Sequence, residues 1–182
     1  MQQKRSRRSR RYRRPMPPWL PLIPTVLLAA GIGLYYGATD GFYVPSESME
    51  PTLQKGDQFR AEVWHSLQEG PKRGQIWVLH NPRPIDDNGP YLVKRVVGLP
   101  GEKIAVAKGK LLIDGKPLEE RYVQEPIKYM IKPVTLGADE YWLLGDNRNN
   151  SQDSHAWGPA KRKGLMGRAF VLYWPFEHFK WL

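Results

Sequence analysis

Two serines lie two residues apart, at Ser46 and Ser48, within the segment "VPSESMEPTLQKGD". In an extended chain, side chains two residues apart point to the same side, so both hydroxyls face one side of the backbone. A serine hydroxyl is a weak nucleophile, and it attacks a carbonyl only when a base lies within hydrogen-bonding reach. Serines beside a proline are more often turn residues. The segment is therefore either a polar turn or the nucleophile segment of an enzyme.

Two side chains could supply the base. Histidine is the usual choice, and His155, which follows Asp153 by two residues, leaves a triad with Ser48 open. A lysine can also act as a base when burial removes the hydration of its ammonium group, because its pKa then falls. Lys94 lies inside the apolar segment "YLVKRVV". Lone lysines in strands more often lie at solvent-facing edges, so burial has to be established.

The neighbours of this lysine favour burial. Strict strand alternation places Lys94 on one face with Leu92 and Val96, and Arg95 on the opposite face with Val93. The lysine would then share its face with apolar side chains alone.

An uncharged segment, residues 19–38, follows a strongly basic start. Eight basic residues between Lys4 and Arg14 account for most of the net charge of +10 and leave +2 for the rest. As a helix, twenty residues span roughly 30 Å, about one hydrocarbon core. A cleaved signal peptide and a buried core helix are the alternatives. By the positive-inside rule we predict a cytoplasmic tail at 1–18, a single transmembrane anchor at 19–38 and an exported domain at 39–182.

The exported part has the pattern of antiparallel β structure. Its apolar segments are short, rich in β-branched and aromatic residues, and bounded by Gly, Pro or Asn; only "AEVWHSLQE" hints at a helical period. The predicted strands lie in "DQFRAEVWH", "GQIWVLHNP", "PYLVKRVVGLPG", "KIAVA", "KLLID", "EYWLLGD" and "GRAFVLYWPF". We predict a mainly β fold, with a core at about 42–97 and 141–182 and a small β insert at about 98–140. The chain has no cysteine, so no disulfide or thiolate metal site is available.

Four segments, in order, give the chain a resemblance to type I signal peptidases, the membrane-anchored serine–lysine proteases that remove signal peptides from exported proteins. "PSESMEPTL" is similar to their nucleophile segment, "RGQIWVLHNP" to the segment usually written Arg-Gly-Asp before a strand, "YLVKRVVGLPGE" to the general-base segment, and "GDNRNNSQDSHAWGP" to the last and most distinctive one. The resemblance covers almost the whole chain. Gln75 replaces the usual Asp, and His155 stands where many bacterial relatives have Arg. Together with Asn149, His155 looks more like the cyanobacterial and plastid members.

The resemblance implies an antiparallel β catalytic domain with a serine–lysine dyad. Ser48 would attack the scissile carbonyl and Lys94 would take its proton. The Ser48 amide and the Ser46 hydroxyl would form the oxyanion hole, and Ser151 would orient the lysine amine. Structural support is implied for Arg95, Asp146, Asn147, Arg148, Asp153 and His155, with Arg95 expected to pair with Asp146.

The resemblance also implies the substrate and the partners. Cleavage would follow small residues of the Ala-x-Ala type, with the signal peptide bound as an added strand. The expected pocket residues are Phe42, Val44, Pro45, Met49 and Val93. We expect no metal or cofactor, no nucleic-acid partner, a monomer, and contact with the bilayer of a cell or thylakoid membrane. The aromatic C-terminus, "FVLYWPFEHFKWL", is either core or membrane-contacting.

Two other classes stay open. A self-cleaving serine–lysine protease of the repressor type shares the dyad and a β core, although such proteins are soluble. A membrane-tethered β binding module with structural serines would lose nothing when Ser48 or Lys94 is replaced.

Overall fold

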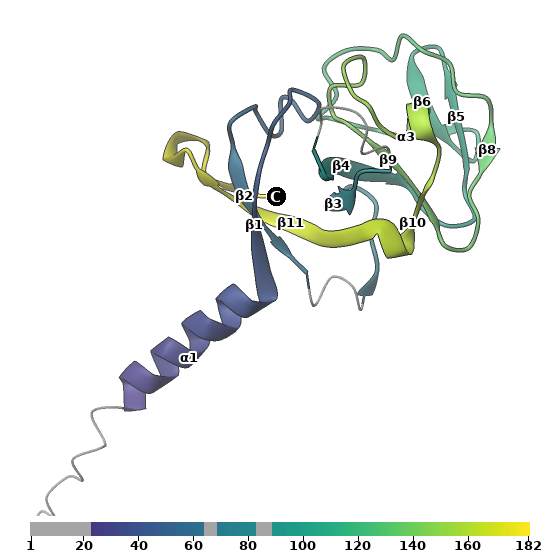
Figure 1. Ribbon diagram of the computed structural model, residues 1–182. Coiled ribbons are helices and arrows are strands. Elements are labelled where there is room, and N and C mark those ends of the chain that lie inside the picture. Colours follow the sequence, from purple (N-terminus) through teal and green to yellow (C-terminus); the bar gives the residue numbers. More distant parts are fainter. Residues whose placement is uncertain (1–22, 64–68, 83–88) are drawn as a thin grey trace, which may run out of the picture. The chain divides into compact units, whose positions relative to one another are not determined.

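A computed structural model describes residues 23–63, 69–82 and 89–182 (Figure 1). Helix α1, Ile23–Ala38, contains only uncharged residues. Its 16 residues correspond to roughly 24 Å of helix. Within the described ranges, no helix combines the length and the apolar character needed to cross a membrane. The predicted cytoplasmic tail and the first four residues of the predicted anchor lie outside the described residues.

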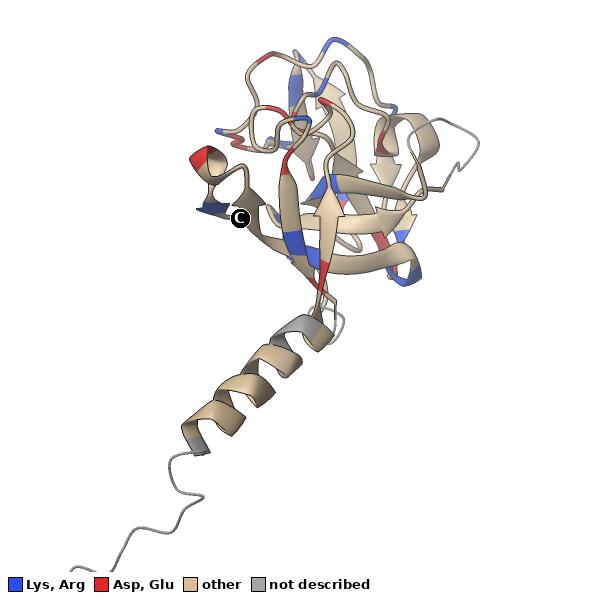
Figure 2. Ribbon diagram, turned by 60° about the vertical axis from the view of Figure 1, so that its left-hand side comes forward, with Lys and Arg blue, Asp and Glu red and all other residues tan. Residues whose placement is uncertain are grey.

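The β domain is built on one large antiparallel sheet. Its strands run in the order β1-β2-β11-β3-β4-β9-β10, and β12 pairs with β11. Their bounds are β1 Thr39–Tyr43, β2 Gln58–Glu62, β3 Ile76–His80, β4 Tyr91–Gly98, β9 Glu140–Leu144, β10 Ala160–Lys161, β11 Leu165–Trp174 and β12 Lys180–Trp181. Basic and acidic residues are intermingled along these strands and their loops (Figure 2). The predicted mainly β, antiparallel architecture is confirmed.

A second, smaller sheet lies in the part of the chain for which an insert was predicted. It has the order β7-β6-β5-β8. The bounds are β5 Lys103–Ala107, β6 Lys110–Ile113, β7 Lys116–Pro117 and β8 Val134–Thr135. We refer to residues 98–140 as the insert. The short helices in the described parts of the domain are α3 Ser154–Trp157, η2 Arg162–Gly164 and η3 Phe176–His178.

The insert shares a hydrophobic core with the large sheet. Ile104 and Leu111 of the insert pack in one buried cluster with Trp142 and Leu144 of β9. Gly98, at the end of β4, marks the junction, because a Cβ atom there would lie 2.6 Å from the Ile104 side chain and 2.8 Å from the Trp142 side chain. Only glycine fits this contact without a shift of its neighbours. The insert is therefore packed directly against the strands that carry the candidate site.

The predicted strands are confirmed where they are described, and β1 and the two-residue strands β7, β8, β10 and β12 were missed. Strand β1, "TDGFY", contains Asp and Gly, which are rare in strands. It forms because residues 39–43 pair in register with β2. The predicted helical hint in "AEVWHSLQE" falls largely on residues 64–68, outside the described ranges.

Candidate active site

Residues 44–57, the predicted nucleophile segment, form a loop between β1 and β2 that we call the nucleophile loop, and its apolar side chains anchor it in the core. Val44, Met49 and Leu53 have fully buried side chains in the core cluster beneath the large sheet. The Val44 amide donates to the Asp57 carbonyl at 2.9 Å, which closes the loop at its base. These contacts hold Ser48 in a fixed, buried position.

Lys94 reaches this serine from the middle of β4. Its backbone lies opposite Trp77 of β3, and its side chain is only 3% exposed. Nζ donates hydrogen bonds to Ser48 Oγ at 2.7 Å and to the Val93 carbonyl at 3.0 Å. Burial lowers the pKa of Lys94 from 10.5 to about 8, although the negative charges of Asp153 and Asp146 oppose part of this change. A neutral amine is therefore accessible at mildly alkaline pH, within hydrogen-bonding reach of a serine hydroxyl.

The second serine borders the same pocket. Ser46 Oγ donates to Ser48 Oγ at 3.3 Å. The pocket has a volume of about 300 Å³, and it is lined by Ser46, Ser48, Val93, Lys94, Ser151 and His155, among others. The Ser48 amide donates to no other described residue. The pocket thus brings the Ser48 hydroxyl and the Lys94 amine together, beside the Ser46 hydroxyl and the Ser48 amide, which are groups that can donate to a developing negative charge.

A loop from Gly145 to Asp153 forms the opposite wall, and we call it the support loop. The Asn147 amide donates to the Ser48 carbonyl at 3.1 Å, and the Gly145 amide donates to Asp153 Oδ2 at 2.9 Å. A Cβ atom at Gly145 would lie 2.3 Å from both the Ser48 carbonyl oxygen and Ser151 Oγ. The support loop and the nucleophile loop therefore touch through a residue that cannot carry a side chain.

Ser151 lies beside Ser48 and Lys94 without the contact expected of it. Its Oγ is buried and has no hydrogen-bond partner among the described residues. The hydrogen bonds of Lys94 Nζ go to Ser48 and Val93 instead. The predicted bond from Ser151 to the lysine is not formed in this structure, although both side chains line one pocket.

The predicted pair between Arg95 and Asp146 is present. Arg95 Nε and Nη2 donate to the two carboxylate oxygens of Asp146 at 2.8 and 2.6 Å, in buried surroundings. Thr52 also donates to Asp146, and Arg95 donates to the Gly74 carbonyl at 2.6 Å. Adjacent residues of β4 thus have opposite environments, because Arg95 has a carboxylate partner and Lys94 has none at hydrogen-bonding distance among the described residues.

Asp153 and His155 do not form a triad with the serine. Asp153 caps helix α3 by accepting from the His155 amide, and its Oδ1 lies 2.8 Å from His155 Nδ1. The His155 ring stacks on Tyr129, with ring centres 4.2 Å apart. In the described parts of the chain no hydrogen bond joins His155 to Ser48. The histidine alternative left open by the sequence is not formed.

Two insert residues at this site, Glu120 and Tyr122, were not predicted from the sequence. Glu120 accepts two hydrogen bonds from the guanidinium of Arg148, at 2.7 and 2.6 Å. The Tyr122 ring lies 3.9 Å from the Arg95 guanidinium. Both residues belong to the polar segment "LEERYV", which has neither strand alternation nor a helical period. Only the fold brings them beside the support loop.

The five predicted pocket residues divide into two groups. Val93 and Pro45 line the serine–lysine pocket, and Pro45 also lines a neighbouring cavity of about 560 Å³ together with Phe42. Val44 and Met49 are 0% exposed and lie in the core. Val44 and Met49 hold the nucleophile loop in place, and neither residue is among the described residues that line these two cavities.

Comparison with known proteins identifies the family. Residues 18–174 match the family described as "Signal peptidase, peptidase S26". The chain is 44% identical over 155 residues to signal peptidase I of Leptolyngbya laminosa, which covers 83% of this chain and 75% of that protein. It is 41% identical over 152 residues to probable signal peptidase I-2 of Synechocystis sp., covering 82% and 69% of the two chains.

A plant relative extends the comparison. Probable thylakoidal processing peptidase 2, chloroplastic, of Arabidopsis thaliana is 37% identical over 136 residues, or 72% of this chain and 37% of that protein. The resemblance to the cyanobacterial and plastid branch is thereby confirmed. The chain belongs to the signal peptidase family, peptidase S26, and is a serine peptidase that removes signal peptides from preproteins.

Proposed function

We propose that Ser48 attacks the scissile peptide bond of the preprotein and that Lys94, as a neutral amine, is the general base. The observation that carries the proposal is the 2.7 Å contact between Lys94 Nζ and Ser48 Oγ in buried surroundings. Burial without a carboxylate partner at hydrogen-bonding distance lowers the pKa of the lysine to about 8. At pH 7 roughly a tenth of the molecules would then carry the neutral amine, compared with about one in three thousand for a free lysine.

The reaction would proceed through an acyl-enzyme. Ser48 Oγ bonds to the scissile carbonyl carbon while its proton passes to Lys94 Nζ. The carbonyl oxygen becomes an oxyanion that accepts from the Ser48 amide and the Ser46 hydroxyl. Collapse breaks the carbon–nitrogen bond, and the Lys94 ammonium returns the proton to the leaving amine. Water, deprotonated by the same lysine, then attacks the ester carbonyl. The bond to Ser48 Oγ breaks, the Lys94 ammonium returns its proton to Ser48 Oγ, and the signal peptide leaves with a carboxylate end.

We further propose that the signal peptide binds as a strand beside β1. Strand β1 lies at one end of the large sheet, and its residues 40–43 line the cavity of about 560 Å³ that adjoins the serine–lysine pocket. An edge strand offers unpaired backbone groups to an added strand. Phe42, Pro45 and Val93 would provide apolar contacts that suit small residues before the cleaved bond.

The C-terminal aromatic residues support a second part of the proposal, contact with the bilayer. Trp174, Phe176, Phe179 and Trp181 are exposed, with Phe176 at 73% and Trp181 at 72%. Clustered aromatic side chains are suited to the interface between lipid and water.

We propose that residues 19–38 anchor the chain in a cell or thylakoid membrane, with the tail 1–18 in the cytoplasm and residues 39–182 on the exported side. One chain supplies the whole dyad, so a monomer suffices.

Cleavage of a preprotein with an Ala-x-Ala site, by the full chain in liposomes, tests the dyad. Ser48→Ala and Lys94→Met should abolish cleavage while the proteins stay folded by circular dichroism, and His155→Ala should remain active. Wild-type activity should rise with pH along a limb centred near pH 8. Cleavage by Lys94→Met together with inactivity of His155→Ala would mean that histidine is the base. Undiminished cleavage by Ser48→Ala would exclude this serine as the nucleophile.

A further inference from the structure

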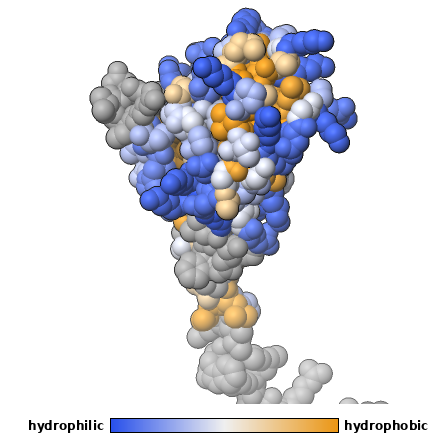
Figure 3. Space-filling view, turned by 90° about the vertical axis from the view of Figure 1, so that its right-hand side faces the viewer, coloured by the Kyte–Doolittle hydropathy of each residue, from blue (hydrophilic) through white to orange (hydrophobic). Residues whose placement is uncertain are grey.

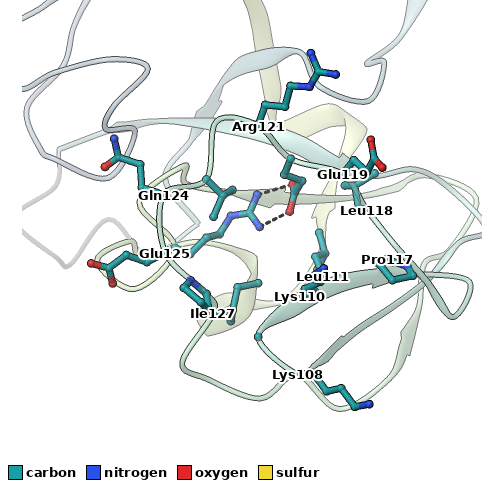
Figure 4. A pocket seen from close by; sticks show the side chains of 15 residues that line it. Lys108, Lys110, Leu111, Pro117, Leu118, Glu119, Arg121, Gln124, Glu125 and Ile127 are labelled. Atoms are coloured by element: carbon teal, nitrogen blue, oxygen red, sulfur yellow. Dashed lines mark hydrogen bonds and ion pairs between the residues drawn. The ribbon is translucent and has the colours of Figure 1, made fainter.

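A buried ion pair joins the insert to the support loop. Arg148 belongs to the support loop, and Glu120 lies in the insert between β7 and β8. Their side chains are 1% and 7% exposed, and both guanidinium Nη atoms donate to the carboxylate (dashed lines in Figure 4). Burial opposes the charge of Arg148, but the hydrogen bonds and the charge of Glu120 outweigh it, so the pKa of Arg148 is raised. The guanidinium therefore keeps its positive charge.

The Arg148–Glu120 pair lines a cavity beside the insert. A cavity of about 750 Å³ is lined by both residues and by Leu111 and Ile127. The face of the molecule on which the insert lies also has an area of apolar atoms surrounded by hydrophilic ones (Figure 3). The neighbouring Glu119 is exposed, and its carboxylate points away from the pair (Figure 4). In the described part of the chain, Glu120 accepts hydrogen bonds from the support loop, whereas no hydrogen bond joins Glu119 to it.

Arg148 connects Glu120 to the backbone beside Ser48. Its Nε donates to the Gly145 carbonyl at 3.0 Å. Gly145 is the residue wedged between the Ser48 carbonyl and Ser151 Oγ. With both Nη atoms held by Glu120, the guanidinium keeps Nε aimed at Gly145. The carboxylate of Glu120 is thus connected to the backbone of Ser48 through Arg148 and Gly145.

Tyr122 connects the same carboxylate to the second arginine. Its hydroxyl donates to Glu120 Oε1 at 2.7 Å, and burial raises the pKa of Tyr122, so the hydroxyl remains a donor. The ring lies 3.9 Å from the guanidinium of Arg95 and 6.0 Å from that of Arg148. Glu120 and Tyr122 therefore fix both arginines that hold the support loop.

We propose that Glu120 is a positioning residue for signal-peptide cleavage, which acts through Arg148 to hold Gly145 against the nucleophile loop. The inference rests on the proposed roles of Ser48 and Lys94. The insert then contributes to catalysis although it supplies no reacting group. A shift of ~1 Å in the position of a reacting atom can cost ~100-fold in rate, so the loss of this constraint should affect kcat.

The test compares Glu120→Gln with Glu119→Gln in the full chain, with kcat and KM measured separately on a preprotein. Both substitutions remove one negative charge and preserve side-chain volume. We expect Glu120→Gln to lower kcat by about 10- to 100-fold with KM unchanged within about twofold, and Glu119→Gln to change neither. Equal kcat values for the two variants would overturn the proposal. A rise in KM at constant kcat would also overturn it, because Glu120 would then act on substrate binding.

A double-substitution cycle separates positioning from a general loss of stability. If Glu120 acts through Arg148, then Glu120→Gln combined with Arg148→Gln should be no slower than the slower single variant. Multiplied losses would show that the two residues act independently, and would refute the inference.

Because Glu120→Gln leaves a buried guanidinium unpaired, its folded fraction is measured by circular dichroism and kcat is given per folded molecule. Should it fail to fold, Glu120→Asp, which keeps the charge with a shorter reach, must still show a lowered kcat.

Failure of this inference can be told apart from failure of the proposed dyad. If Ser48→Ala or Lys94→Met still cleaves, the dyad is wrong whatever Glu120 does. If both are inactive and Glu120→Gln matches Glu119→Gln, the dyad stands and only the role of the insert is refuted.

Discussion

Replacement of the buried lysine should change how the stability of the protein depends on pH. Burial lowers the pKa of Lys94 from 10.5 to about 8. Between these two pH values the unfolded chain binds more protons at this position than the folded chain, so stability rises with pH. The penalty for burying the ammonium is complete below pH 8 and disappears above pH 10.5. At ~1.4 kcal/mol for each unit of pKa, it amounts to ~3 kcal/mol.

Lys94→Met removes the titrating group and with it this pH dependence. Relative to the variant, the wild type should gain ~2.5 kcal/mol in free energy of unfolding between pH 7 and pH 10. The comparison uses urea unfolding of both full chains in one detergent at pH 7, 8, 9 and 10. Tryptophan fluorescence follows the transition, because Trp77 and Trp142 are buried. The exposed Lys132 provides a matched control as Lys132→Met, which should run parallel to the wild type across this range.

One outcome would refute the reasoning. If the difference between wild type and Lys94→Met stays constant within ~0.5 kcal/mol from pH 7 to 10, Lys94 is not held in a neutralising environment. The low pKa on which the general-base role depends would then be absent. The low pKa of Lys94 is supported if the free energy of unfolding of the variant increases relative to that of the wild type as the pH falls from 10 to 7.

Three further substitutions test the surroundings of the dyad. Asp153→Asn should move the acid limb of kcat/KM to lower pH, because the charge of Asp153 raises the pKa of Lys94; a pH–rate profile measures the shift, and an upward shift would contradict the assignment. Gly145→Ala should lower kcat ~100-fold, since its Cβ would lie 2.3 Å from the carbonyl of the nucleophile; single-turnover cleavage measures the loss, and wild-type rates would show that the loops do not touch. Arg95→Met should destabilise the domain by ~3–5 kcal/mol, because Asp146 is left buried and unpaired; a midpoint unchanged in urea would contradict the importance of this pair.

The strands could be predicted because each has a local signal, and Ser48 and Lys94, which lie in hydrogen-bonding contact, also belong to segments with such a signal. The apolar segment that became β4 is buried on both faces, as its composition requires, and successive side chains of a strand point to opposite faces, which places Lys94 apart from Arg95. The nucleophile segment contained two hydroxyls and a proline-rich turn within a few residues. In such segments, neighbours in sequence determine most of the local conformation.

The rest of the site depends on contacts between distant segments. Glu120 and Arg148 are 28 residues apart, and nothing in the polar insert sequence distinguishes Glu120 from Glu119. Val44 and Met49 flank the serine in sequence and were expected in the substrate pocket. Sequence proximity does not determine the direction of a side chain in a loop, and these two point into the core.

The opposite environments of Lys94 and Arg95 have a consequence for repeated turnover. In the proposed reaction Lys94 gains and loses a proton in every cycle, so the charge on its amine alternates. A guanidinium keeps its proton throughout, and the bidentate pair with Asp146 therefore stays intact in both states. Strand β4 thus carries Lys94, whose charge changes, beside Arg95, whose charge is constant. The protein need not rearrange when Lys94 is protonated.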